Sequence, residues 1–340
     1  MKFKKYPEPV LMPDPANPWE SRCVLNPAVV FDEASGKFVM LYRAAGNDAR
    51  HQIRLGLAES ADGIHFTRKS RDPVFEGKHD EPDGGCVEDP RLIPFGDLYY
   101  LTYAARAYAP GQYWLPEAPF PPIYLDETDF RGQEMPAFAR ENITVTYLAA
   151  TRDFRSYKRF GRLTEATVDD RDAYLFPEKI KGKYALISRP KFEGIGLKMP
   201  SIWISFGDDV LEYGPPELLM TGEQPWEVQR IGGGTPPIRT PEGWFMLYHG
   251  VDEKGVYRVG AVLMDPEDPR KITARTKDFL MEPDRDFELQ GIYEGCVFPT
   301  GAVVREGTLY VYYGCADTYI GLATCDFDQL IRYLADECRR

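Results

Sequence analysis

The sequence contains little of what marks a metal-binding or redox protein. Its 340 residues include four histidines and six cysteines, with no C-x-x-C pair and no histidine at metal-ligand spacing from a cysteine. The sequence therefore predicts neither a zinc site nor a redox-active pair, and no metal ligands are expected. The six cysteines are expected to be free thiols that are mostly buried.

Long hydrophobic runs are also missing. Residues 1–7 carry positive charge, but no apolar stretch follows them, and no later run approaches the length of a membrane span. The sequence thus predicts neither a secretion signal nor a membrane partner. A protein of the reducing cytoplasm is the expectation.

Basic residues are fewer than acidic residues in this chain. The chain has 41 lysine and arginine residues against 53 aspartate and glutamate residues, which gives a formal net charge of −12. Nucleic acids and anionic membranes are not expected as partners, because both bind basic faces. Hydrophobic residues make up 43% of the chain and charged residues 28%, a balance typical of a folded protein with a large core.

Helical periodicity is nearly absent. Apolar residues recur at i, i+3, i+4 and i+7 only over residues 326–338, which predicts one short C-terminal helix. Elsewhere short alternating or apolar runs are broken by Gly, Pro, Asp and Asn, which is typical of an all-β protein. Aromatic residues reach 13%, which favours strands and also suits stacking on sugar rings.

The short runs form an internal repeat. Five times a proline-containing segment runs as an apolar strand into a glycine turn, and a second strand follows. These predicted hairpins lie at residues 26–43, 89–103, 175–189, 236–249 and 298–313. Third strands are predicted at residues 53–58, 145–149, 202–205, 258–262 and 320–323.

The repeat also predicts the fold. After two of the third strands, Ser/Thr-x-Asp turns at residues 60–63 and 151–154 indicate a fourth, outer strand. The period is about sixty residues, longer than that of a WD40 blade. Five four-stranded units predict a single five-bladed β-propeller over residues 1–340, followed at its end by the short helix.

One interval departs from the repeat. An insertion at about residues 106–140 is rich in proline and aromatic residues, among them Tyr113, Trp114, Phe120 and Tyr124. Loops of this length are uncommon unless they form a lid, a binding loop or an oligomer contact. Contact with a substrate or partner is favoured over a disordered insertion, because aromatic side chains are wasteful in a solvated linker.

A propeller gathers distant residues, because the inner strands of all blades end at one axial mouth. The repeat places polar residues at such strand ends, namely Asn26, Arg43, Asp89, Arg91, Arg171, Asp172, Arg189, Arg239, His249 and Asp317. Taken singly, an arginine of this set is better explained as part of a structural ion pair, and His249 as a hydrogen-bonded core residue. Their convergence on one axis is what predicts an arginine-rich binding site.

Seven sequence segments, in this order along the chain, match one known enzyme family. They lie at residues 26–44, 88–91, 171–180, 188–190, 232–238, 243–251 and 312–317. Together they resemble the β-mannoside phosphorylases of glycoside hydrolase family 130, which include mannosylglucose and manno-oligosaccharide phosphorylases. The resemblance runs from about residue 22 to residue 325, outside the insertion. It implies a five-bladed propeller, in agreement with the repeat. It also implies inorganic phosphate as co-substrate, with no metal or organic cofactor.

The resemblance implies roles for individual residues. Asp89 matches the family's general acid, which protonates the glycosidic oxygen through the 3-hydroxyl of the bound mannose. The phosphate-binding positions are matched by Arg171, Arg189, Arg239 and His249. The substrate-binding positions are matched by Asn26, Arg43, Arg54, Glu88, Arg91 and Asp317. Guanidinium groups suit phosphate because they bind it through paired hydrogen bonds and stay charged at any working pH.

Two positions depart from the patterns of related enzymes. Arg239 stands where a lysine is commoner in the family, so its contact with phosphate is expected to differ. Asn26 stands where related five-bladed sugar enzymes have an aspartate that acts as base or nucleophile, which weakens a hydrolase mechanism. An inverting hydrolase needs a second carboxylate to activate water, whereas a phosphorylase uses phosphate as the nucleophile.

The resulting expectation is an enzyme, an inverting phosphorylase that converts a β-mannoside and phosphate to α-D-mannose 1-phosphate and a shortened sugar. Two alternatives stay open: an inverting β-mannoside hydrolase on the same fold, and a non-catalytic carbohydrate-binding propeller. The sequence is compatible with β-1,4 and β-1,2 linkages and with glucose, mannose or N-acetylglucosamine as acceptor. It is also compatible with a homo-oligomer whose contacts are the insertion and the C-terminal helix.

Overall fold

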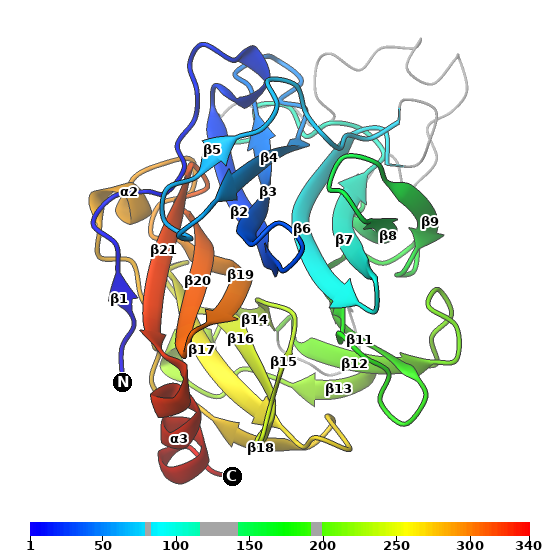
Figure 1. Ribbon diagram of the computed structural model, residues 1–340, viewed down its shortest axis with the longest axis vertical. Helices are drawn as coiled ribbons and strands as arrows, with labels where there is room; N and C mark the ends of the chain where they lie inside the picture. Colours follow the sequence, from blue (N-terminus) through cyan, green and yellow to red (C-terminus); the bar gives the residue numbers. More distant parts are fainter. Residues whose placement is uncertain (79–82, 116–141, 192–198) are drawn as a thin grey trace.

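The computed structural model describes residues 1–78, 83–115, 142–191 and 199–340. Figure 1 shows five small antiparallel sheets arranged around a common centre, each of which is one blade of a propeller. The chain runs through the blades in sequence order, and a short helix follows the last of them. The predicted all-β class, the five-bladed propeller and the C-terminal helix are therefore confirmed.

Blades 1 and 2 each consist of four strands in sequence order. Blade 1 comprises β2 (Cys23–Asp32), β3 (Lys37–Ala45), β4 (Arg54–Ser60) and β5 (Thr67–Arg68). Blade 2 comprises β6 (Cys86–Phe95), β7 (Leu98–Arg106), β8 (Val145–Thr151) and β9 (Lys158–Arg162). The first strands, β2 and β6, contact each other. The outer strands follow the two predicted turns, in which Asp62 and Asp153 accept backbone N–H groups.

Blades 3 and 4 follow the same plan with one variation. Blade 3 comprises β10 (Asp170–Leu175), β11 (Tyr184–Pro190), β12 (Ile202–Gly207) and β13 (Glu217–Met220). Blade 4 comprises β14 (Arg230–Gly233), β15 (Ile238–Thr240), β16 (Gly243–Val251), β17 (Tyr257–Met264) and β18 (Ile272–Arg275). Both β14 and β15 pair with β16, one at each of its ends, so the inner position of blade 4 is divided.

Blade 5 closes the ring with strands from both ends of the chain. It comprises β19 (Val297–Arg305), β20 (Thr308–Cys315), β21 (Tyr319–Asp326) and β1 (Lys4–Lys5). β1 pairs antiparallel with β21, and Figure 1 shows the N-terminal strand beside the last strand of the chain. The predicted helix is α3 (Phe327–Glu337), which begins where the Asp326 side chain accepts the backbone N–H of Gln329.

Three short helical turns precede blades 1, 4 and 5: η1 (Pro18–Glu20), η2 (Pro225–Glu227) and α2 (Asp286–Leu289). Each carries a fully buried glutamate that binds a tyrosine and a cation of its blade. In blade 4 the Tyr248 hydroxyl donates to Glu227 at 2.6 Å, and Arg275 Nη2 lies 2.7 Å from the same carboxylate. The matching sets are Tyr42, Glu20 and Arg68 in blade 1 and Tyr313, Glu288 and Lys5 in blade 5. These buried charges are thereby paired.

The first strands of blades 1, 2 and 3 share a bulge. At these bulges Asn26, Asp89 and Asp172 have φ angles of 44°, 50° and 56°. This left-handed region is uncommon outside glycine, and Asn and Asp adopt it more readily than other residues. The pairing shifts fall between Leu25 and Ala28, between Glu88 and Arg91, and between Arg171 and Tyr174. The repeated bulge sets a polar side chain at the same place in three blades.

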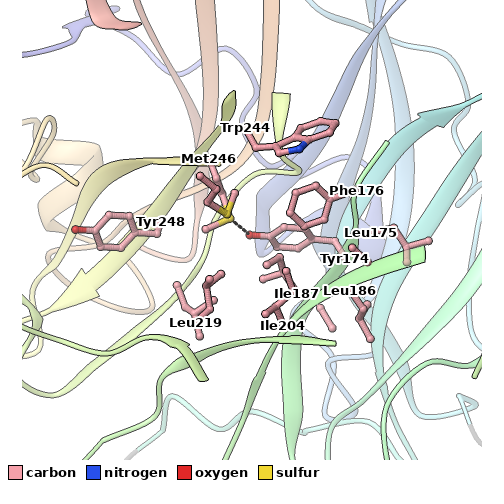
Figure 2. Close-up of a cluster of buried hydrophobic side chains, with 14 of the residues drawn as sticks. Tyr174, Leu175, Phe176, Leu186, Ile187, Ile204, Leu219, Trp244, Met246 and Tyr248 are labelled. Atoms are coloured by element: carbon pink, nitrogen blue, oxygen red, sulfur yellow. Dashed lines mark hydrogen bonds between the residues drawn. The ribbon is translucent and has the colours of Figure 1, made fainter. Parts of the chain in front are cut away.

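A large apolar cluster joins blades 3 and 4. Figure 2 shows Phe176 against Trp244, whose ring centroids lie 5.2 Å apart, edge to face. The Tyr174 hydroxyl points at the Met246 sulfur at 3.3 Å. All four side chains are buried. The packing fixes β10 against β16 and so sets the position of Asp172, two residues before Tyr174.

Two predicted boundaries are wrong. The first strand of blade 3 was expected from about residue 175, but β10 ends there, because Pro177 has no N–H to donate and residues 176–183 form the turn. In blade 4 the expected inner strand at residues 236–239 pairs with only one end of β16, and β14 pairs with the other end. The predicted insertion at residues 106–140 lies largely outside the described residues.

Candidate active site

Side chains from all five blades line one cavity of about 390 Å³. Its polar lining consists of Asn26, Arg43, Glu88, Asp89, Arg106, Asn142, Arg171, Asp172, Arg189, Lys191, Arg230, His249 and Asp317. Tyr113, Tyr257, Tyr293 and Phe298 add aromatic surface. The cavity brings together nine of the residues predicted from the sequence, which are Asn26, Arg43, Glu88, Asp89, Arg171, Asp172, Arg189, His249 and Asp317.

Arg239 does not reach this cavity. It pairs with Trp244 at the start of β16, whereas His249 lies near the opposite end of the same strand. Five residues of extended strand separate these positions by about 17 Å. The Arg239 guanidinium lies 5.0 Å from the Trp244 ring and donates to the Pro266 carbonyl at 2.9 Å. The expectation that Arg239 lies with the other predicted phosphate-binding residues is therefore wrong.

Arg54 and Arg91 also lie outside the cavity wall. Arg54 begins the third strand of blade 1, one strand further from the axis than Arg43, and its Nε lies 2.9 Å from Glu76 Oε2 in a separate groove. Arg91 is 1% exposed and lies beneath the cavity. The expectation that both side chains line the same cavity as the other predicted substrate-binding residues is therefore wrong.

On one side of the cavity, here called the carboxylate side, Asp89 lies with Asn26, Arg43, Glu88 and Asp317. Asp89 Oδ1 accepts hydrogen bonds from Asn26 Nδ2 at 2.7 Å and from Arg43 Nη1 at 2.8 Å. Burial alone raises the pKa of Asp89, but Arg43 and Asn26 outweigh it and lower the pKa to about 2. Asp89 is therefore an ionised carboxylate in the ligand-free site.

The two other carboxyl groups on this side differ in their charge. Burial disfavours the ionised form of Glu88, but Arg106 at 2.8 Å and Arg43 at 3.0 Å lower its pKa below the ordinary value. Burial raises the pKa of Asp317 to about 6, against the attraction of Arg43. Near neutral pH, Asp317 is therefore close to its titration point and offers both a donor and an acceptor form.

A second group of lining residues, here called the cationic side, consists of Arg171, Asp172, Arg189, Arg230 and His249. Arg189 Nε donates to Asp172 Oδ2 at 2.6 Å. Arg171 Nη2 lies 2.8 Å from Asp169 Oδ2, and Arg230 Nη2 donates to the Tyr257 hydroxyl at 2.6 Å. Three guanidinium groups from two blades thus face one space, where they suit a compact anion.

His249 contributes no charge to this side. Burial lowers its pKa to about 3, so the imidazole is neutral at neutral pH. Its ring packs between Tyr257 and Phe298, with centroid distances of 5.4 and 4.7 Å. A Cβ on Gly232 would lie 2.7 Å from both His249 Nε2 and Asp172 Oδ2, so the close approach of β14 requires glycine there.

Unpartnered polar atoms concentrate at the cavity. Among the described residues, seven buried side-chain nitrogen or oxygen atoms have no hydrogen-bond partner. Four of these, Asn26 Oδ1, Arg43 Nε, Arg91 Nη2 and His249 Nδ1, lie in the cavity wall or directly beneath it. Buried polar atoms are nearly always paired in folded proteins, so this concentration indicates a ligand site.

Arg230 was not among the residues predicted from the sequence. It opens β14 two residues before the run Gly232-Gly233-Gly234, and its side chain lines the cavity. An arginine two residues before three glycines, with a proline pair shortly after them, was the available signal. Arg106 and Lys191, which also line the cavity, stand at or just beyond the ends of second strands.

The sequence profile described as β-1,4-mannooligosaccharide phosphorylase, for glycoside hydrolase family 130, matches residues 2–114 and 137–336. The chain belongs to glycoside hydrolase family 130. The family resemblance seen in the sequence is thereby confirmed. The gap between the two matched ranges, residues 115–136, falls within the predicted insertion.

This family 130 protein has named relatives of similar length. It is 36% identical to a 1,2-β-oligomannan phosphorylase of Thermoanaerobacter sp. (strain X514), over 97% of this chain and 99% of the relative. It is 33% identical to a β-1,2-mannobiose phosphorylase of the same strain, over 95% and 96%. The solved structure of a Listeria innocua β-1,2-mannobiose phosphorylase with β-1,2-mannobiose superposes with a TM-score of 0.78 at 25% identity, covering 98% and 99%.

Other features predicted from the sequence can be compared with the structure. All six cysteines are free, and five of them are buried, as predicted. In residues 1–78, 83–115, 142–191 and 199–340, no group of three or more His, Cys, Asp or Glu side chains is arranged to hold a metal ion. None of the helices in these ranges has the length and apolar content needed to cross a bilayer.

Proposed function

We propose that this protein catalyses the inverting phosphorolysis of β-1,2-linked mannosides. Inorganic phosphate displaces the leaving sugar, and α-D-mannose 1-phosphate is formed. The relatives that share 36% and 33% of its residues are named as phosphorylases of β-1,2-linked mannosides. This naming favours the β-1,2 linkage over the β-1,4 linkage of the family profile.

The presence of carboxylates and guanidinium groups in one cavity is the observation that carries this proposal. Asp89 and Asp317 interact with Arg43 in one group of lining residues, and Arg171, Arg189 and Arg230 line the same cavity. A β-mannoside between them places its anomeric carbon next to the guanidinium groups. A phosphate held there is itself the nucleophile, so no carboxylate is needed to activate water. Three arginines lining one cavity favour an anionic co-substrate over the binding of a neutral sugar alone.

The reaction is a single displacement at the anomeric carbon. Phosphate attacks from the face opposite the leaving group, so the β bond becomes an α bond. The bond from C1 to the leaving oxygen breaks as the bond from C1 to phosphate forms, and the leaving oxygen takes up one proton. If the attacking phosphate is HPO₄²⁻, it loses one proton over the whole reaction, and this proton balances the one that the leaving oxygen gains. Mannose 1-phosphate is then released as the dianion. Guanidinium groups that stay charged hold the phosphate in line throughout.

Asp89 carries the proton to the leaving oxygen by way of the mannose 3-hydroxyl. In the ligand-free site Arg43 keeps Asp89 ionised, with a pKa of about 2. A phosphate dianion adds negative charge to the cavity, which raises the pKa of Asp89. Phosphate binding therefore favours the protonated form of Asp89, which is the form that acts as the acid.

The remaining residues hold the sugar. Asn26 and Arg43 flank Asp89, and Asp317 offers a carboxyl group in either protonation state to vicinal hydroxyls. His249, being neutral, supplies a hydrogen bond to phosphate and no charge. Because the cavity takes residues from every blade, we infer that residues 1–340 act as one catalytic domain. The free cysteines support a reducing cytoplasm as its location.

The test is incubation of the protein with β-1,2-mannobiose, β-1,4-mannobiose and 4-O-β-mannosylglucose, each with and without phosphate. We expect α-mannose 1-phosphate only when phosphate is present, with kcat/KM for β-1,2-mannobiose at least about tenfold above the others. Free mannose in phosphate-free buffer supports the hydrolase alternative instead. Binding of mannobiose without any turnover supports the non-catalytic alternative.

A further inference from the structure

Arg91 joins three blades beneath the cavity. It lies on β6 of blade 2, two residues after Asp89, and its side chain is 1% exposed. Its Nη1 donates to the backbone carbonyl of Asp89 at 2.9 Å, and its Nε donates to the carbonyl of Gly234 at 2.6 Å. Gly234 directly follows β14, the strand that carries Arg230. One guanidinium group therefore holds the backbone on both sides of the cavity.

The third contact of the Arg91 guanidinium group is with blade 3. Its Nη2 lies 3.7 Å from Asp172 Oδ1, while the other oxygen, Oδ2, accepts Arg189 Nε at 2.6 Å. Both arginines lower the pKa of Asp172, against the effect of burial, so Asp172 stays ionised. Asp172 is thus a buried anion held between two buried cations, Arg91 beneath the cavity and Arg189 in its wall.

The side chains and carbonyl groups around Arg91 restrict the orientation of its guanidinium group. The rings of Tyr174 and Phe298 lie 5.6 and 5.7 Å from it. These are apolar walls, so the hydrogen bonds to the two carbonyls and the Asp172 charge set its orientation. The bonded carbonyl belongs to Asp89, whose φ of 50° is uncommon for a residue other than glycine. Arg91 thereby helps to hold Asp89 in the bulge that aims it into the cavity.

We propose that Arg91 and Asp172 are positioning residues that couple the proton donor to the phosphate site: Arg91 fixes the Asp89 backbone, Asp172 fixes Arg189, and the Arg91–Asp172 contact links the two. This proposal rests on the proposed function, because it assigns Asp89 and Arg189 their roles. It adds that the geometries of proton transfer and phosphate binding depend on each other. Arg91 itself does not touch substrate.

The alternative is that Arg91 and Asp172 only stabilise the fold. Arg275 is a matched control, because it is also buried, also bound to a carboxylate (Glu227) and a backbone carbonyl (Thr221), but does not line the cavity. If the role is structural, Arg91→Lys and Arg275→Lys have the same consequence, which is lower thermal stability with unchanged kinetic constants. Lysine keeps the charge but cannot bond in three directions at once.

The experiment measures kcat and the KM for phosphate in the phosphorolysis of β-1,2-mannobiose by the full-length protein. For Arg91→Lys we expect kcat to fall and the KM for phosphate to rise, each about tenfold or more. For Asp172→Asn we expect the KM for phosphate to rise about tenfold, with a smaller change in kcat. Arg275→Lys is expected to change neither constant, whatever its melting temperature.

The sign of the Asp172→Asn effect separates positioning from simple electrostatics. A carboxylate beside an anion site repels the anion, so loss of its charge without loss of geometry lowers the KM for phosphate. A rise in KM supports positioning, and a fall overturns it. If Arg91→Lys does not fold, Asp172→Asn still decides the question.

A double variant tests the link itself. If Arg91 and Asp172 act through their contact, the combined effect of Arg91→Lys and Asp172→Asn on kcat/KM is smaller than the product of the single effects. Strictly multiplicative effects overturn the coupling. The proposed function is judged separately, on the native protein. If the native protein makes no mannose 1-phosphate, the function fails, whereas normal phosphorolysis with unchanged constants in the variants refutes only the positioning role.

Discussion

Arg43 Nη1, from blade 1, lies 2.8 Å from Asp89 Oδ1, from blade 2, and this contact sets the charge of the carboxylate side. The same nitrogen lies 3.0 Å from Glu88 Oε2, so one guanidinium group balances two neighbouring carboxylates. Asp89 is consequently ionised when the cavity is empty. In the proposed mechanism the negative charge of phosphate favours protonation of Asp89, so binding of the nucleophile prepares the proton donor.

Replacement of Asp89 by asparagine tests the proton donor. Asparagine keeps the size of the side chain but carries no transferable proton, so we expect kcat/KM for β-1,2-mannobiose to fall by about 10²–10⁴. The measurement is the rate of mannose 1-phosphate release, with the melting temperature as a check of folding. Asp97→Asn, an exposed aspartate paired with Arg152, serves as the control and should retain full activity. Near-native turnover by Asp89→Asn contradicts the assignment.

Arg230 and Arg239 form a matched pair for the phosphate site. Arg230 faces the cavity, whereas Arg239 stacks on Trp244 at the other end of blade 4. A charged hydrogen bond contributes about 1.5–3 kcal/mol, so Arg230→Met should raise the KM for phosphate roughly tenfold to a hundredfold. Arg239→Met should leave it unchanged. The reverse outcome would restore Arg239 to the phosphate site and remove Arg230.

Gly232 tests how closely β14 must approach the phosphate site. An added Cβ would lie 2.3 Å from His249 Cε1 and 2.7 Å from Asp172 Oδ2, both in the cationic side. Overpacking of this kind costs about 1–3 kcal/mol, so Gly232→Ala should raise the KM for phosphate about fivefold to a hundredfold. In Gly214→Ala the new Cβ meets only the Phe206 carbonyl, at 3.5 Å, and the KM should not change. Equal kinetics in the two variants rule out a tight fit at Gly232.

Asp170 gives a pH dependence to stability. Burial raises the pKa of Asp170 to about 7, from an ordinary value of 3.8. Between these values the unfolded chain releases a proton that the folded protein keeps, so this group makes folding less favourable as the pH rises from about 4 to 7. Asparagine stays neutral and can still accept the backbone N–H of Arg189, which lies 3.0 Å from Asp170 Oδ1.

For Asp170→Asn we therefore expect a melting temperature that rises relative to the native protein by about 2–4 °C or more between pH 4 and pH 8. The measurement is thermal unfolding by circular dichroism at several pH values. A difference that stays constant across this range shows that the pKa of Asp170 is not raised.

The sequence specified most of this fold because each blade repeats the same local signals. A proline, an apolar strand and a glycine turn mark each hairpin, and side chains that follow equivalent positions meet at the axis. Asn26, Asp89 and Asp172 were recognisable for that reason. Their left-handed conformation was not, since a bulge depends on how two strands pair rather than on either strand alone.

The errors concerning Arg239, Arg54 and Arg91 have physical causes. Arg239 was expected at the axial end of the inner strand of blade 4, where blades 1 to 3 have their polar residues. The inner strand of blade 4 is instead interrupted, and β14, not the strand that carries Arg239, lies at the axial end. Arg54 belongs to a strand one step from the axis. Arg91 follows the bulge at Asp89, after which the side chain points beneath the cavity, and no periodicity in the sequence reveals that change.

The closure of blade 5 by β1 also bears on how the protein is made. Asn26 and Arg43 are synthesised well before Asp317, yet all three border the same cavity. During translation four blades can assemble while β2 still lacks its neighbour β19 and β1 lacks β21. Until β19, β20 and β21 emerge, a nascent chain therefore has an open seam between its first and last blades, and a cavity that lacks the residues of blade 5.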